Sequence, residues 1–400
     1  MRTLIKEKGF EFLIYGFILF LFFSKGIPNI FLGVLLIWII IDLKKIKKPK
    51  LSFFFSSTFI LVGLLFFLSI KAIIFGTINE NFKIYKGLIL CFLIAFIFKN
   101  IKDVKKIKTV ILLGITASVI TSLFLIVIYF LEHHSLPFSN TAEVNELLIL
   151  ERPYIGFIAI LGIVLATEKF VNNENLKKLW LLNAIMNLLF ILLISARISI
   201  ITLFLLAVIY LLFYTKISWY KKGASLISFI VLFGIIIVTS KNISERFFIK
   251  NSLEESLKVA SDYEPRIVIW NCASNMCKNT NFNVLLGFEG YKIIEQNFVN
   301  CYAVTIENQS KKEYFLEEKF NSHNQFIDFY LVGGLIALIL FLGFFIKLFF
   351  EIRNNFFQTG IVITFLLFFC VENIFYRQLG CYLFGIFILF LANRKQEING

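Results

Sequence analysis

Charged residues, proline and histidine are scarce in this 400-residue chain, which has 16% charged residues, 5 Pro and 3 His. Soluble domains usually have about 25% charged residues. Hydrophobic residues make up 58% of the chain, and 51 residues are Phe. Long apolar runs with few breakers predict membrane helices, because backbone amides in lipid must find partners within their own segment. The runs do not alternate between polar and apolar residues, which excludes a β-barrel.

The formal charge of +14 comes from 40 Lys and Arg residues against 26 Asp and Glu residues. In a soluble protein such a charge would suggest nucleic-acid binding. Here the basic residues lie mostly in the connections between apolar runs. We therefore expect the lipid bilayer, and no nucleic acid, as their partner.

Twelve apolar runs are candidate membrane spans. A helix needs about 20 apolar residues to cross the hydrocarbon, and shorter helices cross with the help of side chains that reach the interface. The runs are residues 10–23, 27–41, 52–70, 84–98, 109–131, 153–167, 179–195, 198–214, 223–239, 325–346, 356–371 and 379–392. No small-x-small cleavage site follows the first run, so we interpret it as a retained helix.

The apolar stretch 179–213 is too long for one span, since about 35 residues make roughly 50 Å of helix. Basic residues stand before it, at Lys177, and after it, at Lys216, so both ends are predicted to lie on one side. The stretch must then fold back near Ser195-Ala196-Arg197, on the opposite side of the membrane.

Basic clusters occur in every second connection. They are Arg2/Lys6/Lys8, 44–50, 99–108, Lys169/Lys177/Lys178, Lys216/Lys221/Lys222, Lys347/Arg353 and Arg394/Lys395. Because cytoplasmic loops are enriched in Lys and Arg, these connections and both termini are predicted to be cytoplasmic. The predicted fold is all-α: a polytopic inner-membrane protein of about 12 transmembrane helices. Residues 1–239 hold helices one to nine, 240–322 form one large periplasmic loop, and 323–400 hold the last three helices and a cytoplasmic tail.

The loop is predicted to contain short helices at 253–260 and 266–277 and a turn-rich connection at 285–290. Its three cysteines, Cys272, Cys277 and Cys301, allow at most one internal disulfide. Plain burial is the alternative. The spacing of Cys272 and Cys277 is not that of a zinc CxxC pair, so no metal site is expected.

Two arginines are candidates for chemistry. An arginine at a membrane boundary is costly unless it is paired or faces water, which makes Arg197 a functional candidate; the alternative is a snorkelling side chain. Arg266 begins an amphipathic stretch of the loop, and a solvated surface charge is its alternative.

His323 lies where the loop re-enters the membrane. Ser322 and Gln325 frame it in a capping-box pattern, which predicts Ser322 as the N-cap and His323 in the first helical turn. The positive potential of a helix N-terminus favours the neutral imidazole, which is the form a general base needs. The alternative is a histidine at headgroup level with no role. Asp328 lies roughly 140° around the helix and is not expected to orient His323.

Glu372 and Arg377 bracket the short outer connection before the last helix. They could pair with each other, or with Arg152 and Glu151 at the start of the sixth predicted helix. A structural ion pair and substrate contact both remain open.

Several segments in this order resemble the O-antigen ligase family of membrane glycosyltransferases, which is related to O-antigen polymerases. The most specific is Ser322-His323-Asn324-Gln325 leading into a helix with Gly333 and Gly334. The others are Ser195-Ala196-Arg197, 266–270, 285–290 and 372–380. The resemblance covers roughly residues 150 to 392.

The resemblance implies a metal-independent inverting enzyme of lipopolysaccharide or other polysaccharide biosynthesis, with no cofactor. It would move a glycan from undecaprenyl diphosphate to the lipid A–core, or a similar acceptor, at the periplasmic face. Arg197 and Arg266 would bind the leaving diphosphate, and His323 would take the proton of the acceptor hydroxyl. The expected substrate-binding residues are Arg152, Asn324, Glu372 and Arg377.

Two other functions remain open. A polymerase of the same superfamily would use the same arginines and loop. A transporter of lipid-linked oligosaccharides would need charged groups along the helix middles. The candidate residues here gather at the outer boundary instead, which favours an enzyme.

Overall fold

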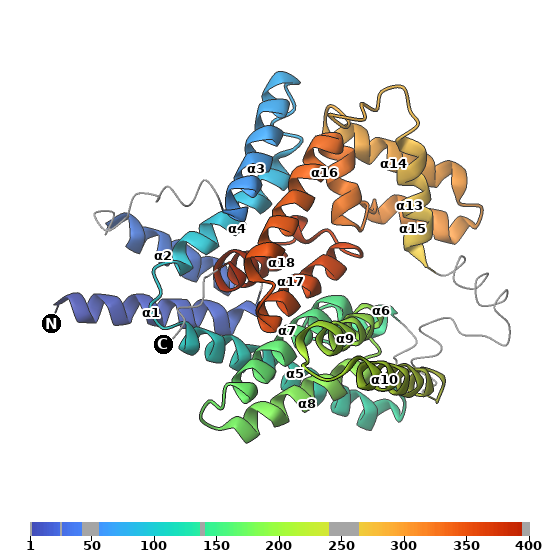
Figure 1. Ribbon diagram of the computed structural model, residues 1–400. Coiled ribbons are helices and arrows are strands. Elements are labelled where there is room, and N and C mark those ends of the chain that lie inside the picture. Colours follow the sequence, from blue (N-terminus) through green and yellow to red (C-terminus); the bar gives the residue numbers. More distant parts are fainter. Residues whose placement is uncertain (1, 25, 42–55, 137–140, 240–263, 394–400) are drawn as a thin grey trace. The chain divides into compact units, whose positions relative to one another are not determined.

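The computed structural model describes residues 2–24, 26–41, 56–136, 141–239 and 264–393. Within these ranges the regular structure is helical, apart from one isolated β-bridge between Asn283 and Gly287. The prediction of an all-α fold is confirmed (Figure 1).

All twelve apolar runs form helices. They are α1 Arg2–Leu21, α2 Ile27–Ile41, α3 Ser57–Ile74, α4 Phe82–Phe98, α5 Val104–His133, α7 Arg152–Val171, α8 Lys177–Leu193, α9 Arg197–Ile209 with η3 Tyr210–Tyr214, α10 Trp219–Thr239, α16 Gln325–Ile352, α17 Phe356–Phe369, and α18 Gln378–Leu383 with η5 Phe384–Ala392. Among the described residues, five helices are long and apolar enough to cross a membrane: α3, α5, α7, α9 with η3, and α16. The count of 12 spans and their sidedness stay predictions.

Shorter helices lie between these. They are α6 Thr141–Leu147, α13 Pro265–Met276, α14 Tyr291–Thr305, α15 Gln309–Glu318 and η4 Ile374–Tyr376. The predicted helix at 266–277 is confirmed as α13, whereas the one predicted at 253–260 lies outside the described residues. The predicted break near Ser195 is also confirmed, because α8 ends at Leu193 and α9 begins at Arg197.

The chain divides into two compact units. Unit 1 comprises Met1–Ile46, Ile97–Leu257 and Asn355–Thr364, and unit 2 comprises Lys47–Phe96, Lys258–Asn354 and Phe365–Gly400. In unit 1, α7 packs against α5, α8 and α9 and is buried along most of its length. In unit 2, α3 packs along α16, and α13, α14 and α15 pack in succession.

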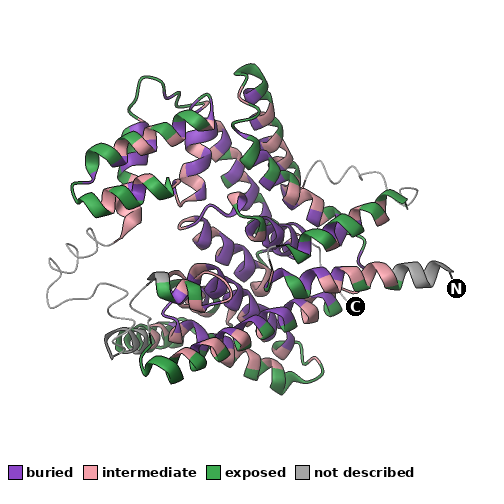
Figure 2. Cartoon of the chain, turned by 180° about the vertical axis from the view of Figure 1, so that it is seen from behind, coloured by how far each residue is buried: buried purple, intermediate pink, exposed green. Residues whose placement is uncertain are grey.

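The three loop helices of unit 2 form a small core of their own. Each of α13, α14 and α15 has buried residues among exposed ones, as the colours of the chain show (Figure 2). Tyr302 of α14 is fully buried, and its ring lies edge-on to Phe315 of α15, with centroids 5.2 Å apart. Such aromatic pairs contribute about 0.5–1.5 kcal/mol beyond the area they bury.

A cluster of phenylalanines fixes the connection between α17 and α18. Phe375 lies at its centre, with ring centroids 5.1 Å from Phe384, 5.6 Å from Phe369 and 6.0 Å from Phe341 of α16. Packing of this density holds the backbone of residues 370–376 against α16.

Candidate functional site

Asn324 is the N-cap of α16. Its backbone is extended (φ −158°, ψ 114°), and its side-chain oxygen accepts hydrogen bonds from the backbone N–H of Phe326 at 3.0 Å and of Ile327 at 3.1 Å. The prediction that Ser322 caps this helix is therefore wrong. Ser and Asn are both good caps, but the Ser322 hydroxyl is bound instead by the side chain of Asn373, whose Nδ2 donates to it at 3.0 Å.

His323 consequently precedes the helix instead of lying in its first turn, which corrects the second half of that prediction. Its backbone is left-handed, with φ 42°, a region in which His, Asn and Asp occur more often than most residues. Its N–H donates to Asn321 Oδ1 at 3.0 Å, and its ring lies 5.5 Å from that of Phe320. The imidazole is about a fifth exposed, and its Nδ1 lies 3.7 Å from Oε2 of Glu372.

Arg266 reaches the same carboxylate. It stands in the first turn of α13, after Pro265, a residue favoured at the start of a helix because it needs no hydrogen bond to its nitrogen. Its Nε donates to the carbonyl of Val371 at 3.2 Å, Nη1 to Glu264 Oε1 at 3.0 Å and Nη2 to Glu372 Oε1 at 3.4 Å. Arg266 thus makes three contacts, and its side chain is only 24% exposed. A solvated surface charge would have fewer contacts and more exposure, so the geometry favours the functional interpretation.

Glu372 joins the two candidate groups. One carboxylate oxygen faces the guanidinium of Arg266 and the other faces the imidazole of His323. Burial by itself raises the pKa of Glu372, but the neighbouring imidazole of His323 acts in the opposite direction. With the positive charges of Arg266 and Arg377 added, the pKa lies below its usual value. The carboxylate is therefore an anion that holds two cationic or basic groups together.

A buried polar network lies behind this cluster. Asp328 of α16 is 2% exposed and accepts from the hydroxyl of Tyr376 at 2.8 Å, from Gln325 Nε2 at 3.3 Å and from Asn373 Nδ2 at 3.3 Å. Burial, reinforced by the carboxyl of Asp328, raises the pKa of Tyr376 well above its usual value. Tyr376 thus stays a donor. The network fixes residues 373–376 to the start of α16, next to Glu372.

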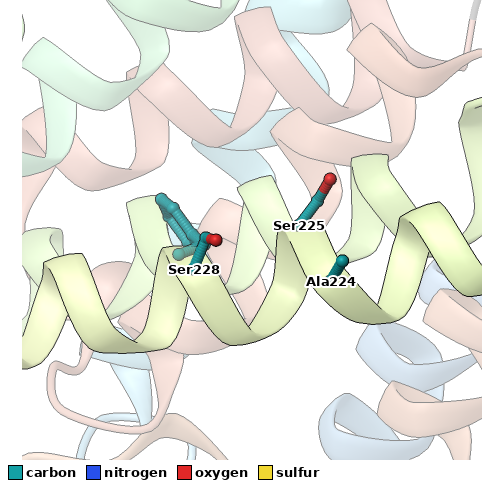
Figure 3. A pocket seen from close by; sticks show the side chains of 4 residues that line it. Ala224, Ser225 and Ser228 are labelled. Carbon is teal, nitrogen blue, oxygen red and sulfur yellow. The ribbon is translucent and has the colours of Figure 1, made fainter.

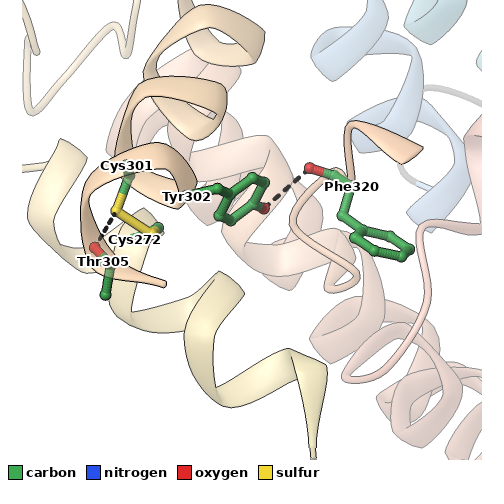
Figure 4. Close-up of a disulfide and its surroundings, with 5 residues drawn as sticks. All are labelled: Cys272, Cys301, Tyr302, Thr305 and Phe320. Carbon is green, nitrogen blue, oxygen red and sulfur yellow. Dashed lines mark hydrogen bonds between the residues drawn. A yellow bond between two sulfur atoms is a disulfide. The ribbon is translucent and has the colours of Figure 1, made fainter. Parts of the chain in front are cut away.

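A disulfide connects the loop helices that frame the cluster. Cys272 of α13 is bonded to Cys301 of α14, one of the alternatives that the sequence left open (Figure 4). The next residue, Tyr302, donates its hydroxyl to the carbonyl of Phe320 at 3.0 Å (Figure 4). Trp270 of α13 donates to the carbonyl of Ser322 at 3.1 Å. The loop helices therefore hold the turn that contains His323 from two sides.

The remaining predicted residues occupy other places. Arg377 precedes α18 in unit 2, where its charge acts on Glu372. Arg152 begins α7 in unit 1, is 2% exposed, and its backbone N–H donates to Asn145 Oδ1 at 2.9 Å.

Arg197 begins α9 in unit 1, directly after the turn at Ser195, whose backbone is left-handed with φ 50°. Gly156 of α7 makes room for this turn, because a Cβ there would lie 2.9 Å from the Cβ of Ala196. The structure thus brings Arg266, His323, Asn324 and Glu372 together in unit 2, while the convergence of Arg197 and Arg152 on them stays a prediction.

Residues 182–342 match the family model described as O-antigen ligase. They form an O-antigen ligase family domain. The matched range of this O-antigen ligase domain includes Arg197, Arg266 and His323. No curated protein matches the chain.

The O-antigen ligase domain indicates the family of O-antigen ligases and polymerases, which are membrane glycosyltransferases acting on lipid-linked glycans. The chain is accordingly a multi-pass membrane protein with five candidate spans. Glu372 and Arg377 lie C-terminal to the matched range, and Arg152 lies before it.

Two other kinds of site were considered, a surface hollow and a metal-binding cluster. A shallow hollow lies on α10, lined by Ala224, Ser225, Ser228 and Phe229 (Figure 3). None of these four side chains titrates, so the hollow offers neither acid, base nor charge. Among the described residues, no three His, Cys, Asp or Glu side chains gather as they would around a metal ion.

Sequence reasoning named Glu372 but did not find its partners. It expected Glu372 to contact substrate, or to pair with Arg377 or Arg152. Arg266 is 106 residues away in the chain, and no spacing rule reports such a pairing. The available signal was chemical: a buried acid in a segment of few charges needs a basic partner.

Proposed function

We propose that this chain is an O-antigen ligase-type glycosyltransferase. It would transfer a glycan from undecaprenyl diphosphate to a lipid A–core or similar acceptor at the periplasmic face of the inner membrane. The observation that carries the proposal is the Arg266–Glu372–His323 cluster, in which one buried carboxylate faces a guanidinium and an imidazole.

His323 acts as the general base. With Glu372 facing Nδ1, the proton of the neutral imidazole is held on that nitrogen, and Nε2 is left to accept a proton from the acceptor hydroxyl. The separation of 3.7 Å is longer than a hydrogen bond, as is common before substrate binds. Glu372 is thus a positioning residue that also stabilises the imidazolium that forms.

The transfer is a single displacement. The acceptor oxygen forms a bond to the anomeric carbon as its proton passes to His323, and the bond from that carbon to the diphosphate oxygen breaks with inversion. The electron pair leaves with the diphosphate, whose negative charge must be neutralised. Arg266 suits this task, because contacts within the described residues engage three of its five N–H donors and leave two for phosphate oxygens.

Arg197 would supply a second guanidinium to the same diphosphate. Its support is the matched domain, which includes it, and its place at a helix start directly after a left-handed turn. Backbone strain of this kind is concentrated at functional sites.

The Cys272–Cys301 disulfide supports a periplasmic location of the loop. Disulfides persist in oxidising compartments such as the periplasm and are rare in the cytosol. Both cysteines belong to the helices that frame His323. A donor exported to the outer leaflet would meet the cluster on that side.

The test is complementation of a deletion strain with His323→Ala, Arg266→Ala or the unchanged gene, followed by profiling of surface polysaccharide. We expect both variants to lose glycan transfer while the protein stays in the membrane. His133→Ala is the matched control, since His133 is an exposed histidine of unit 1. Normal glycan in the His323→Ala strain would contradict the proposed base. Polymer left on its lipid carrier would identify a ligase, and single repeat units on the core a polymerase.

A further inference from the structure

Helix α16 is broken at Gly334, where φ is 62° and ψ is −159°. In an unbroken helix the N–H groups of Leu335 and Ile336 would donate to the carbonyls of Leu331 and Val332, four residues earlier. The break separates these pairs. Four backbone groups in a candidate membrane span therefore need other partners.

The loop segment 283–288 supplies two acceptors. The N–H of Leu335 donates to the carbonyl of Val284 at 2.8 Å, and that of Ile336 donates to the carbonyl of Leu285 at 3.3 Å. The loop backbone thus takes the place of the preceding helical turn.

The two carbonyls are satisfied as well. Leu331 accepts from the N–H of Phe288 at 2.8 Å, and Val332 accepts from the ammonium of Lys71. Lys71 is buried on α3 and also donates to the carbonyl of Phe288, so it joins α3, α16 and the loop segment at one point.

Hydrogen bonds within the segment satisfy several of its own backbone groups. Asn283 and Gly287 exchange hydrogen bonds in both directions, at 3.4 and 2.6 Å. The side-chain oxygen of Asn283 accepts from the N–H of Leu285 at 2.9 Å and of Leu286 at 3.0 Å. Non-helical backbone at membrane depth is tolerated only where it is buried in protein or lines a water-filled cavity. The bonds to α16, to Lys71 and within the segment give these backbone groups protein partners.

Two glycines make the close approach possible. A Cβ on Gly287 would lie 2.5 Å from the carbonyl oxygen of Leu331, and a Cβ on Gly334 would collide with the carbonyl of Leu285. Both glycines have positive φ, 72° and 62°. The fit is therefore specific to this pair of backbones.

Apolar side chains on the segment remain exposed. Val284 is 56% and Leu285 55% exposed. Leu335, which donates to Val284, is 37% exposed, and Ile339, one turn further along α16, is 57% exposed. The backbone bond between Leu335 and Val284 puts the apolar residues of the loop next to those of a candidate span.

The predicted span of α16 places the break, and these apolar residues with it, at the depth of the hydrocarbon. Gly334 follows Gln325, the first residue of α16, by nine residues, which is roughly 14 Å of helix. Lys347, the nearest basic residue of the helix beyond the break, follows by thirteen more, or roughly 20 Å. With 325–346 as the predicted span, the break lies inside a hydrocarbon layer of about 30 Å. Lys71, which contacts Val332, directly follows the predicted span 52–70, so the break belongs to the outer half of that layer.

We propose that residues 283–288 form a re-entrant segment that lies within the bilayer, with Val284 and Leu285 in contact with lipid acyl chains. The predicted aqueous loop would then have one part embedded in the leaflet that surrounds the first half of α16. This inference does not depend on which glycan is transferred, or on whether any is.

The test is spin-label accessibility in liposomes. A nitroxide at Leu285→Cys is compared with labels at Ile339→Cys, an exposed residue within the predicted span 325–346, and at Val304→Cys, an 86% exposed residue of α14. The free cysteines Cys91, Cys277, Cys370 and Cys381 are first replaced by serine or alanine. Oxygen partitions into hydrocarbon, whereas a nickel chelate stays in water.

We expect the ratio of oxygen to nickel accessibility at Leu285 to match that at Ile339 and to exceed that at Val304 several-fold. Val284→Cys provides a second reporter should the first label disturb the fold. A ratio at both positions equal to that of Val304 would overturn the proposal. Loss of glycan transfer in the His323 variants would have no influence on this measurement, so the two proposals fail separately.

Discussion

Glu372 illustrates how one buried carboxylate sets the properties of its neighbours. It holds the Nδ1 side of His323 and one arm of Arg266 at the same time. Its removal should therefore affect both proton transfer and diphosphate binding, although Glu372 itself need not touch substrate.

The Glu372→Gln variant tests this role. We expect kcat to fall by up to roughly 10²–10⁴-fold, the usual contribution of general acid–base catalysis, because Glu372 orients the proposed base. The measurement is kcat and KM with purified donor and acceptor. An unchanged kcat would show that His323 works without Glu372.

Glu372 should also make stability depend on pH. Its pKa is lower in the folded protein than in the unfolded chain, so the unfolded state binds the proton more readily. The stability from this group is full above about pH 4.3, the ordinary pKa of Glu, and is lost as pH falls through the lower folded value. We expect the unfolding temperature of the unchanged protein to fall below pH 4.3 more steeply than that of Glu372→Gln.

Asp328 is predicted to matter for stability. Asp328→Ala would leave the hydroxyl of Tyr376 and the amides of Gln325 and Asn373 without their acceptor, at a cost of about 1–3 kcal/mol. Thermal unfolding in detergent measures this loss of stability. Glu317→Ala, which removes an exposed acid of α15, should change stability by less than about 0.5 kcal/mol and serves as control.

At the scale of elements, the break in α16 gives a sharp comparison between two glycines of one helix. Gly334→Ala must adopt a backbone that only glycine takes easily, costing about 1–3 kcal/mol before the collision with Leu285 is counted. A Cβ on Gly343 would meet only Ile60 Cγ2, at 4.0 Å. We expect Gly334→Ala to lower the yield of folded protein strongly and Gly343→Ala to leave it unchanged. Equal yields would contradict the observed break.

The disulfide between α13 and α14 should be needed to hold the turn around His323. The Cys272→Ser and Cys301→Ser double variant should lose about 2–4 kcal/mol of stability. Cys277→Ser is the control, because Cys277 is a free cysteine on the same loop. A maleimide should label Cys301 only after reduction. Labelling without reduction would show that the bond does not form.

At the scale of the whole molecule, the sequence predicted the elements well and their partners poorly. Every apolar run became a helix, because lipid leaves the backbone little alternative. The cap of α16 was misjudged, since Asn373, far along the chain, binds Ser322 and leaves Asn324 to cap. A local sequence pattern cannot predict a contact between residues far apart in the chain. The pairing of Glu372 with Arg266 was missed for the same reason.

The predicted sidedness can be checked with reporter fusions. Alkaline phosphatase, which is active only outside the cytoplasm, should be active when fused within 306–308, between α14 and α15. It should be inactive when fused near Lys216, in a basic connection. The reverse pattern would place the Arg266–Glu372–His323 cluster inside the cell, where an exported donor could not reach it.

Hydrogen bonds from Lys71, and the close approach at Gly287 and Gly334, attach the loop segment 283–288 to α3 and α16. The loop helices are therefore not an independent domain. A secreted fragment containing only the loop would expose the carbonyls of Val284 and Leu285 to solvent, because their donors on α16 would be missing. Such a fragment should be a poor antigen or crystallisation target. If residues 283–288 enter the bilayer as proposed, an anchor within the membrane would set from below how high the Arg266–Glu372–His323 cluster stands above it.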